Sequence, residues 1–235
     1  MHLWRRRYKY RVQLWHRLLK DAVVPQESPI IRYGSAMGGW HLPSELIQSD
    51  WLVYDFGVGD DISFDIALVE RHGCAIHAFD PTPESIAFME DKSLPGFQFH
   101  PVGVWDDDTI IKFWKPSSDD SISHSADNLR RSSEYVEVEM RTIKTLAAEL
   151  GHEHIDFIKM DVKGAEQRVI PNLIHDGFRP TLLCLEYDWP YEVYSLLSIK
   201  WFLAGLRLHR IIQNAGYDLI SKDGRNATYR LSSAD

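Results

Sequence analysis

Residues 51–81 constrain the fold most, because they read as strand, turn, helix and second strand. Residues 52–54 form a short apolar run, typical of a parallel strand that is covered on both faces. An acid and two spaced glycines follow, in the order Asp55-Phe56-Gly57-Val58-Gly59. Apolar residues at helical spacing then lead to Gly73, and residues 75–79 form a second apolar run. This order predicts one βαβ unit.

The turn after the first strand indicates a nucleoside ligand. Gly57 and Gly59 let the backbone approach a ligand closely, and Asp80 at the end of the second strand is placed to accept hydrogen bonds from ribose hydroxyls. A dinucleotide would favour a third glycine and a helix start without negative charge, whereas this chain has Ile62 there and Asp60-Asp61 before it. A ligand with ammonium and sulfonium groups and no phosphate fits better, which predicts S-adenosylmethionine as the cofactor.

Length and charge indicate one domain with a basic arm. The chain has 235 residues, 44% of them hydrophobic, which is enough for one sizeable core. Residues 1–20 carry seven of the 26 Lys and Arg and no acid, so 19 basic and 34 acidic residues, a formal charge of −15, remain from Asp21 onward. Such a body repels phosphate backbones, so we do not expect nucleic acid as a partner, except through the arm.

Cysteines and acidic runs do not indicate a metal site. Cys74 and Cys184 are the only cysteines and lie far apart, so neither a disulfide framework nor a zinc site is indicated, and a reducing, cytoplasmic compartment is favoured. Three consecutive acids at 106–108 lack the alternating ligands around a glycine that a calcium loop needs, so we interpret them as a solvated turn. No apolar run approaches the roughly 18 residues of a membrane span.

The first 24 residues read as a basic amphipathic helix, with apolar residues three or four apart. It could pack on the acidic body or on a second copy in a homodimer, or it could contact a membrane surface or RNA. We place this helix and its linker in residues 1–35 and the domain in 36–235, and we expect the domain to fold without residues 1–24. The Gly-rich segment 33–40 is either a lid over the ligand or a plain connector.

The middle of the chain continues the β/α pattern. A third strand is predicted at 97–100, and residues 102–105 and 110–114 read as a hairpin. A long polar loop at 116–133 contains His124. After a half-exposed strand and a short helix, residues 155–166 form a strand that ends in Asp161 and runs into a helix through Gly164.

The C-terminal part predicts how the sheet ends. Residues 181–188 read as a fifth parallel strand that ends in acids, residues 194–214 as a long helix, and residues 217–231 as a hairpin. We therefore expect an α/β fold with a Rossmann-like, seven-stranded, mostly parallel sheet, a C-terminal antiparallel hairpin and helices on both faces. The hairpin distinguishes this sheet from the six parallel strands of a dehydrogenase.

Residues 50–190 resemble the FkbM-like family of S-adenosylmethionine-dependent methyltransferases, which have the class I methyltransferase fold. The resemblance rests on the acid and glycines of 55–61, on Asp80-Pro81, and above all on Ile155-Asp156-Phe157-Ile158-Lys159-Met160-Asp161-Val162-Lys163-Gly164-Ala165-Glu166, which is similar to the family's I-D-x-I-K-x-D-x-E-G-x-E. It implies the following roles: Asp55, Gly57 and Gly59 beside the methionine part of the cofactor, Asp80 beside its ribose, and Asp161 at the methyl-transfer site. We also include Gly103 and Asp161 among the cofactor-binding residues.

The family resemblance implies methyl transfer to an oxygen of a small molecule or glycan. The candidates for the base that takes the hydroxyl proton are Asp161, Glu186 and His124, at two strand ends and in the long loop. Lys163 stands where the family carries an acid. It is either a counter-ion to nearby carboxylates or a contact to an acidic acceptor. It also motivates a second hypothesis, a cofactor-binding module that has lost methyl transfer.

Overall fold

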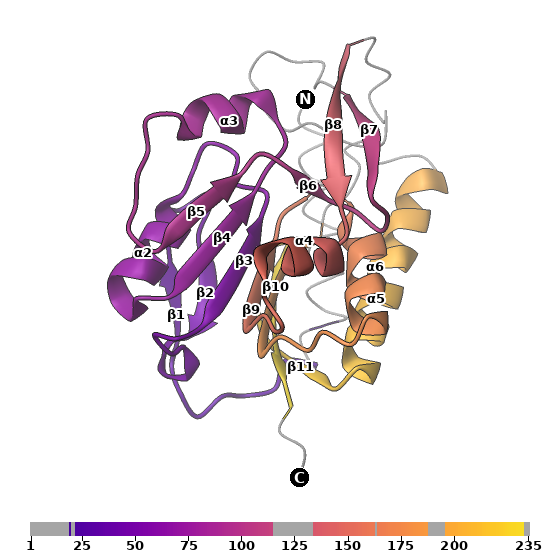
Figure 1. Cartoon of the computed structure of the whole chain (residues 1–235). Helices are drawn as coiled ribbons and strands as arrows, with labels where there is room; N and C mark the ends of the chain where they lie inside the picture. The colour runs from indigo at the N-terminus through magenta and orange to yellow at the C-terminus, as the bar shows by residue number, and fades with distance from the viewer. Residues whose placement is uncertain (1–18, 20–21, 115–133, 163, 188–195, 233–235) are drawn as a thin grey trace, which may run out of the picture.

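The chain folds around a mostly parallel sheet of seven strands, shown in Figure 1. The computed structural model describes Leu19 and residues 22–114, 134–162, 164–187 and 196–232. The strands of this sheet are β3 (Leu52–Phe56), β4 (Ala75–Phe79), β5 (Phe97–His100), β9 (Phe157–Met160), β10 (Leu182–Glu186), β11 (Tyr217–Asp223) and β12 (Asn226–Leu231). Their order is β11-β12-β10-β9-β3-β4-β5.

The direction of the strands confirms the predicted fold class. Neighbouring strands from β10 to β5 are parallel, whereas β12 runs antiparallel to both β10 and β11. The C-terminal hairpin therefore inserts its last strand between β10 and β11. This is the antiparallel ending that the pattern of residues 217–231 predicts.

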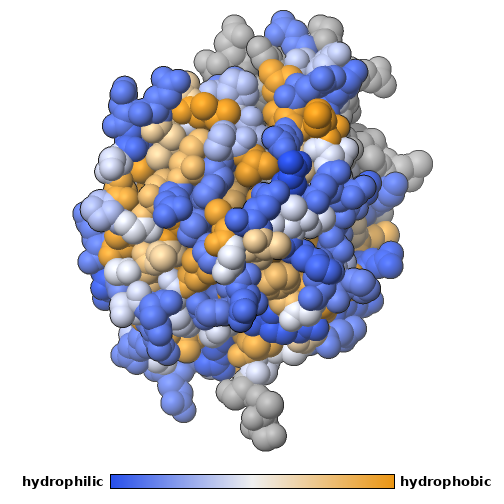
Figure 2. Space-filling view, in the orientation of Figure 1, coloured by the Kyte–Doolittle hydropathy of each residue, from blue (hydrophilic) through white to orange (hydrophobic). Residues whose placement is uncertain are grey.

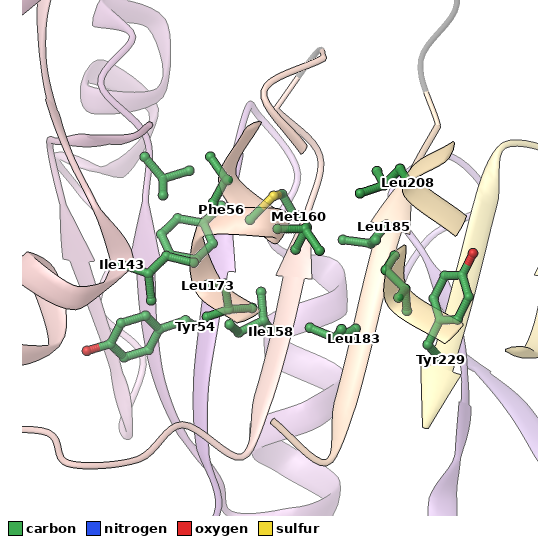
Figure 3. Packing of buried hydrophobic residues seen from close by; sticks show 14 of the residues in the cluster. Tyr54, Phe56, Ile143, Ile158, Met160, Leu173, Leu183, Leu185, Leu208 and Tyr229 are labelled. Atoms are coloured by element: carbon green, nitrogen blue, oxygen red, sulfur yellow. The ribbon is translucent and has the colours of Figure 1, made fainter. Parts of the chain in front are cut away.

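Side chains alternate between the two faces of the sheet, as the period of two in a strand requires. One face packs against α4 (Ile143–Leu150), α5 (Glu166–His175) and α6 (Leu196–Asn214), which lie together in Figure 1. Figure 3 shows this layer from close by. The residues that β3, β9 and β10 contribute to it are Tyr54, Phe56, Ile158, Met160, Leu183 and Leu185. Figure 2 shows that hydrophilic side chains cover much of the surface on this side of the molecule.

The opposite face of the sheet packs against α2 (Ser63–His72) and a small antiparallel ribbon made of β1 (Ile30–Tyr33) and β2 (Trp40–Pro43). Val53, Phe157 and Leu182 contribute the sheet side of this second core cluster, and all three are fully buried. A third cluster lies beside α3 (Pro83–Met89). Both faces are therefore covered, which explains the near-continuous apolar runs of the parallel strands.

A second sheet consists of β6 (Gly103–Val104), β7 (Thr109–Trp114) and β8 (Tyr135–Arg141). Its order is β6-β8-β7, with β8 parallel to β6 and antiparallel to β7. The prediction of a hairpin between 102–105 and 110–114 is therefore wrong. A later strand, β8, separates the two segments, and local sequence patterns do not report such a long-range pairing.

Several contacts join the expected N-terminal segment to the domain. Leu19 is 2% exposed in the main core, and the Val24 backbone nitrogen donates to the Leu219 carbonyl at 2.8 Å. Moreover, β1 and β2 pair across the expected boundary between residues 35 and 36. Deletion of residues 1–24 would remove part of the core, so the structure does not support the expectation that the remainder folds unaffected.

Three histidines and a tyrosine form a polar cluster on β3, β4, β5 and the segment after α4. His77 Nδ1 lies 2.9 Å from His100 Nε2, and the Tyr54 hydroxyl lies 2.7 Å from His152 Nδ1. Burial, followed by the charges of His152 and His100, lowers the pKa of His77 to about 4. Burial also lowers the pKa values of His100 and His152. The cluster is therefore neutral in the native state at neutral pH.

We expect this cluster to destabilise the fold in mild acid. Between the ordinary histidine pKa of 6.5 and about 4, the unfolded chain binds a proton at His77 that the folded chain does not. The free energy of unfolding therefore falls as pH falls through that window. Thermal melts between pH about 7 and about 5 should show a smaller loss for His77→Gln than for wild type. His175→Gln is the control, because the His175 side chain is 85% exposed. Equal losses of stability in wild type and both variants would contradict the assignment of this acid sensitivity to His77.

Candidate functional site

The carboxyl ends of β3, β4, β9 and β10 open onto one cavity of about 390 Å³. This volume lies within the range of small-molecule sites, and the position is where open α/β sheets bind ligands. Six of the sequence-predicted site residues line it, namely Gly57, Gly59, Asp80, Gly103, Asp161 and Glu186. Asp55 is not part of this lining. His124 and Lys163 lie outside the described residues, so their roles stay predictions.

Asp80 organises the half of the cavity next to β4. One of its carboxylate oxygens accepts from the Gly59 backbone nitrogen at 3.0 Å, and the other accepts from the Thr82 nitrogen and hydroxyl at 2.9 and 2.6 Å. Thr82 in turn caps the first turn of α3, which begins at Pro83. Asp80 is 6% exposed. Its hydrogen bonds join the turn after β3 to the turn after β4.

The turn after β3 requires glycine for both backbone angle and space. Gly57 has φ +90° and Gly59 has φ +61°, in the left-handed region. A Cβ on Gly57 would come closer than 3.0 Å to the carbonyl oxygen of Asp161 on the neighbouring strand. The close approach of two strand ends therefore excludes any other residue at Gly57.

Gly103 lies across the cavity, where the small second sheet meets the turn after β4. A Cβ there would crowd the sulfur of Met140 and, at 3.0 Å, a ring carbon of Pro81. Both Gly103 and Met140 line the cavity. The role of Gly103 as a cofactor-binding residue stays a prediction.

The other half of the cavity is polar. Asp161 follows β9, Glu186 ends β10, and Arg225 and Asn226 come from the turn between β11 and β12. Arg225 lies 2.5 Å from a carboxylate oxygen of Glu186, and its side chain is 25% exposed against 8% for the glutamate. This half therefore offers two carboxylates, a guanidinium and an amide to a second ligand.

The Gly-rich segment before β2 also reaches the cavity. Met37, Gly38 and Trp40 are part of the lining. The Ser35 hydroxyl donates to a carboxylate oxygen of Asp61 at 2.6 Å, which ties the segment to the start of α2. Burial alone would raise the pKa of Asp61, but hydrogen bonds from Ser35 and Ser63 outweigh it and hold the pKa below its ordinary value.

Sequence reasoning assigned no role to Lys159, although it lines the cavity. Its ammonium lies 2.8 Å from a carboxylate oxygen of Asp55, and the two residues face each other on β9 and β3. Asp55 is 1% exposed. A lysine within the apolar run Phe157–Met160 was the available signal, because a buried cation needs a buried partner.

The chain is similar in sequence to a protein family and to two relatives. Residues 53–219 match the family described as Methyltransferase FkbM domain. The chain is 26% identical over 138 residues to probable methyltransferase-like protein 24 of Homo sapiens, which covers 57% of this chain and 31% of that protein. The Rattus norvegicus protein of the same name is 26% identical over 123 residues, 52% of this chain and 28% of that protein. The chain thus spans less than a third of either relative.

Two solved structures are similar in fold. Human N-acetylserotonin methyltransferase in complex with SAM superposes with a TM-score of 0.38 and 14% identity, over 79% of this chain and 48% of that chain. The fibrillarin pre-rRNA processing protein of Methanococcus jannaschii superposes with a TM-score of 0.42 and 10% identity, over 89% and 84% of the two chains. At these identities the likeness concerns the fold alone.

Proposed function

Because the chain belongs to the FkbM methyltransferase family, we propose that it transfers a methyl group from S-adenosylmethionine to a hydroxyl oxygen of a small molecule or glycan. The observation that supports this most is the convergence of the glycine turn, Asp80 and Asp161 on one cavity. These three features come from three parallel strands, β3, β4 and β9, that are neighbours only in the folded sheet. We assign the side of the cavity with the glycine turn and Asp80 to the cofactor, and the side with Asp161 and Glu186 to the acceptor.

The charge of the lining fits a cationic cofactor. The described residues that line the cavity include Asp60, Asp61, Asp80, Asp161 and Glu186, against two basic residues, Lys159 and Arg225. A cleft with excess negative charge attracts ammonium and sulfonium groups and disfavours phosphates. S-adenosylmethionine carries both of these cationic groups, and when bound it would supply the activated methyl.

Asp80 would hold the ribose of the cofactor. A carboxylate offers about four acceptor positions, and Asp80 uses three of them for Gly59 and Thr82. The remaining acceptor position is on the oxygen that accepts from Gly59, and Asp80 is part of the cavity lining. The glycine turn would lie against the methionine part, because Gly57 and Gly59 present backbone without side chains there.

Asp161 or Glu186 would take the proton of the acceptor hydroxyl. Both line the half of the cavity away from Asp80, and both are carboxylates at strand ends. Their further role is to orient the acceptor toward the cofactor, because positioning supplies much of the rate in a displacement of this kind. Arg225 and Asn226 would add hydrogen-bond donors for that acceptor.

Calorimetry and a release assay test the proposal. We expect S-adenosylmethionine to bind with micromolar-scale affinity and NAD not to bind. Release of S-adenosylhomocysteine should then depend on one or more hydroxyl compounds from a panel of small molecules and glycans. Binding without release on any acceptor would favour the cofactor-binding module, and binding of NAD alone would overturn the proposal.

Substitution of Asp80 by alanine should weaken S-adenosylmethionine binding by about tenfold or more, because a hydrogen bond to a charged group contributes roughly 1.5–3 kcal/mol. Titration calorimetry measures the change. Asp91→Ala is the control, since Asp91 is an exposed acid outside the lining. Thermal melts must accompany the titrations, because Asp80 also holds the Gly59 and Thr82 amides. Unchanged affinity in a folded Asp80→Ala protein would contradict the ribose assignment.

The partners and location stay predictions. Residues 1–18 lie outside the described part of the chain, so contact of this arm with a membrane surface, or with a second copy in a homodimer, rests on the sequence. Among the described residues, no helix combines the length and the apolar character needed to cross a bilayer. A cytoplasmic location and the absence of a nucleic-acid partner rest on cysteine use and charge.

A further inference from the structure

Three buried ionisable side chains lie beneath the glycine turn. The Lys159 ammonium is 2.8 Å from a carboxylate oxygen of Asp55, and it donates to the Gly57 carbonyl at 2.8 Å. Asp65, on the first turn of α2, completes the group through its interaction with Asp55. Asp55 and Lys159 occupy facing positions on two parallel strands, so the sheet register itself brings their side chains together.

The cluster is almost entirely buried. Asp55 and Asp65 are each 1% exposed, and Lys159 is 6% exposed. Burial, and then the charge of Asp55, raises the pKa of Asp65 well above its ordinary value. Burial would lower the pKa of Lys159, but the charges of Asp55, Asp161 and Asp65 outweigh it and raise the pKa. Burial therefore disfavours the charged form of Asp65, and the 2.8 Å contact pairs Asp55 with Lys159.

Burying an ion pair is a poor way to gain stability. Desolvation of two charges costs as much as their attraction returns, and apolar residues of similar size often stabilise a core equally well. The sheet around this cluster is built from such residues, including Val53 and Phe157 on the same face. The cluster therefore points to a role other than stability, because Lys159 lines the cavity and donates to the Gly57 carbonyl of the glycine turn.

Lys159 is the member of the cluster that contacts this turn. The Gly57 nitrogen donates to the Phe79 carbonyl at 3.0 Å, and its carbonyl accepts from Lys159. Both backbone polar groups of Gly57 are thus held by strands on either side. Glycine adopts positive φ without strain, so the turn is intrinsically flexible, and the hydrogen bonds to Gly57 select one of the conformations open to it.

We propose that Lys159, held in place by Asp55, is a positioning residue that fixes the glycine turn and thereby shapes the methionine half of the cofactor site. This inference rests on the proposed function, because it assigns the turn to the methionine part of S-adenosylmethionine. It gives Asp55 an indirect role, because Asp55 acts through Lys159 and does not line the cavity. The nucleoside half depends on Asp80 and Thr82 instead.

The proposal predicts which part of the ligand loses affinity. S-adenosylhomocysteine contains the amino-acid half, whereas adenosine lacks it. Loss of the Lys159 hydrogen bond should weaken S-adenosylhomocysteine by about tenfold or more while adenosine stays within about twofold of wild type. A variant that merely loosens the whole domain would weaken both ligands together.

The first variant is Lys159→Met, which keeps the length and removes the charge. It leaves Asp55 buried without a cation and can fail to fold for that reason. The double variant Asp55→Asn/Lys159→Met removes both charges together, so it keeps the core neutral while the Gly57 carbonyl still loses its donor. Lys144→Met is the matched control, because the Lys144 side chain is 67% exposed on α4.

Calorimetry with the two ligands is combined with hydrogen exchange on the ligand-free full-length proteins. We expect the double variant to lose affinity for S-adenosylhomocysteine alone, and a peptide covering residues 55–62 to exchange faster while one covering 80–85 is unchanged. Wild-type affinity, equal loss of both ligands, or unchanged exchange at 55–62 would each overturn the inference. If wild type binds neither S-adenosylmethionine nor S-adenosylhomocysteine, the proposed function itself fails, and the inference with it.

Discussion

Replacement of Gly57 by alanine should remove measurable binding of S-adenosylhomocysteine. The residue has φ +90°, and a Cβ would meet the Asp161 carbonyl closer than 3.0 Å. That oxygen belongs to the backbone, so relief of the clash requires the ends of β3 and β9 to separate. Backbone strain of about 1–3 kcal/mol, added to this displacement at the floor of the cavity, predicts a loss of at least about a hundredfold in affinity.

Gly151→Ala separates backbone angle from crowding. Gly151 has φ +74°, close to that of Gly57, and a Cβ there would meet no atom within 4 Å. Alanine at 151 should therefore lower stability by about 1 kcal/mol and leave ligand affinity unchanged. Thermal melts and calorimetry on both variants supply the comparison. A folded Gly57→Ala protein with wild-type affinity would show that the turn does not contact the ligand.

The second large effect concerns the general base that takes the proton of the acceptor hydroxyl. We expect Asp161→Asn to lower kcat by about 100-fold to 10,000-fold, the usual contribution of a positioned general base, and to weaken cofactor binding by a much smaller factor. Asp161 follows the strand next to the glycine turn, and its backbone carbonyl lies against Gly57. It thus lines the half of the cavity that contains Glu186, next to the glycine turn assigned to the cofactor.

Glu186→Gln is the matched comparison for Asp161→Asn. Glu186 is paired with Arg225, so its carboxylate is already engaged by the guanidinium. We therefore expect a smaller loss of kcat, about tenfold, together with a change in KM for the acceptor. Both variants are assayed by S-adenosylhomocysteine release on an acceptor that wild type methylates. A larger loss in Glu186→Gln would reverse the assignment, and two active variants would leave His124 as the remaining candidate.

The sequence determines the parts of this protein that repeat with a local period. Mostly apolar runs at 52–54, 75–79 and 155–160 predict parallel strands, because a strand covered on both faces needs apolar side chains at most positions. The acids and glycines that follow those runs can be assigned to one cavity, because the carboxyl ends of parallel strands lie at one edge of the sheet. The order of elements also predicts the antiparallel C-terminal hairpin that the structure confirms.

Only the tertiary structure decides which distant residues share a buried space. It pairs Asp55 with Lys159 across 104 positions of sequence, inserts β8 between β6 and β7, and places Leu19 in the main core. None of these follows from periodicity, because a periodic pattern reports which face of an element is buried but not what that face meets. The pKa of a buried carboxylate depends on these tertiary contacts, since desolvation and the nearest charge set it. Asp55 therefore reads as a ligand contact in the sequence and becomes the partner of a buried lysine in the fold.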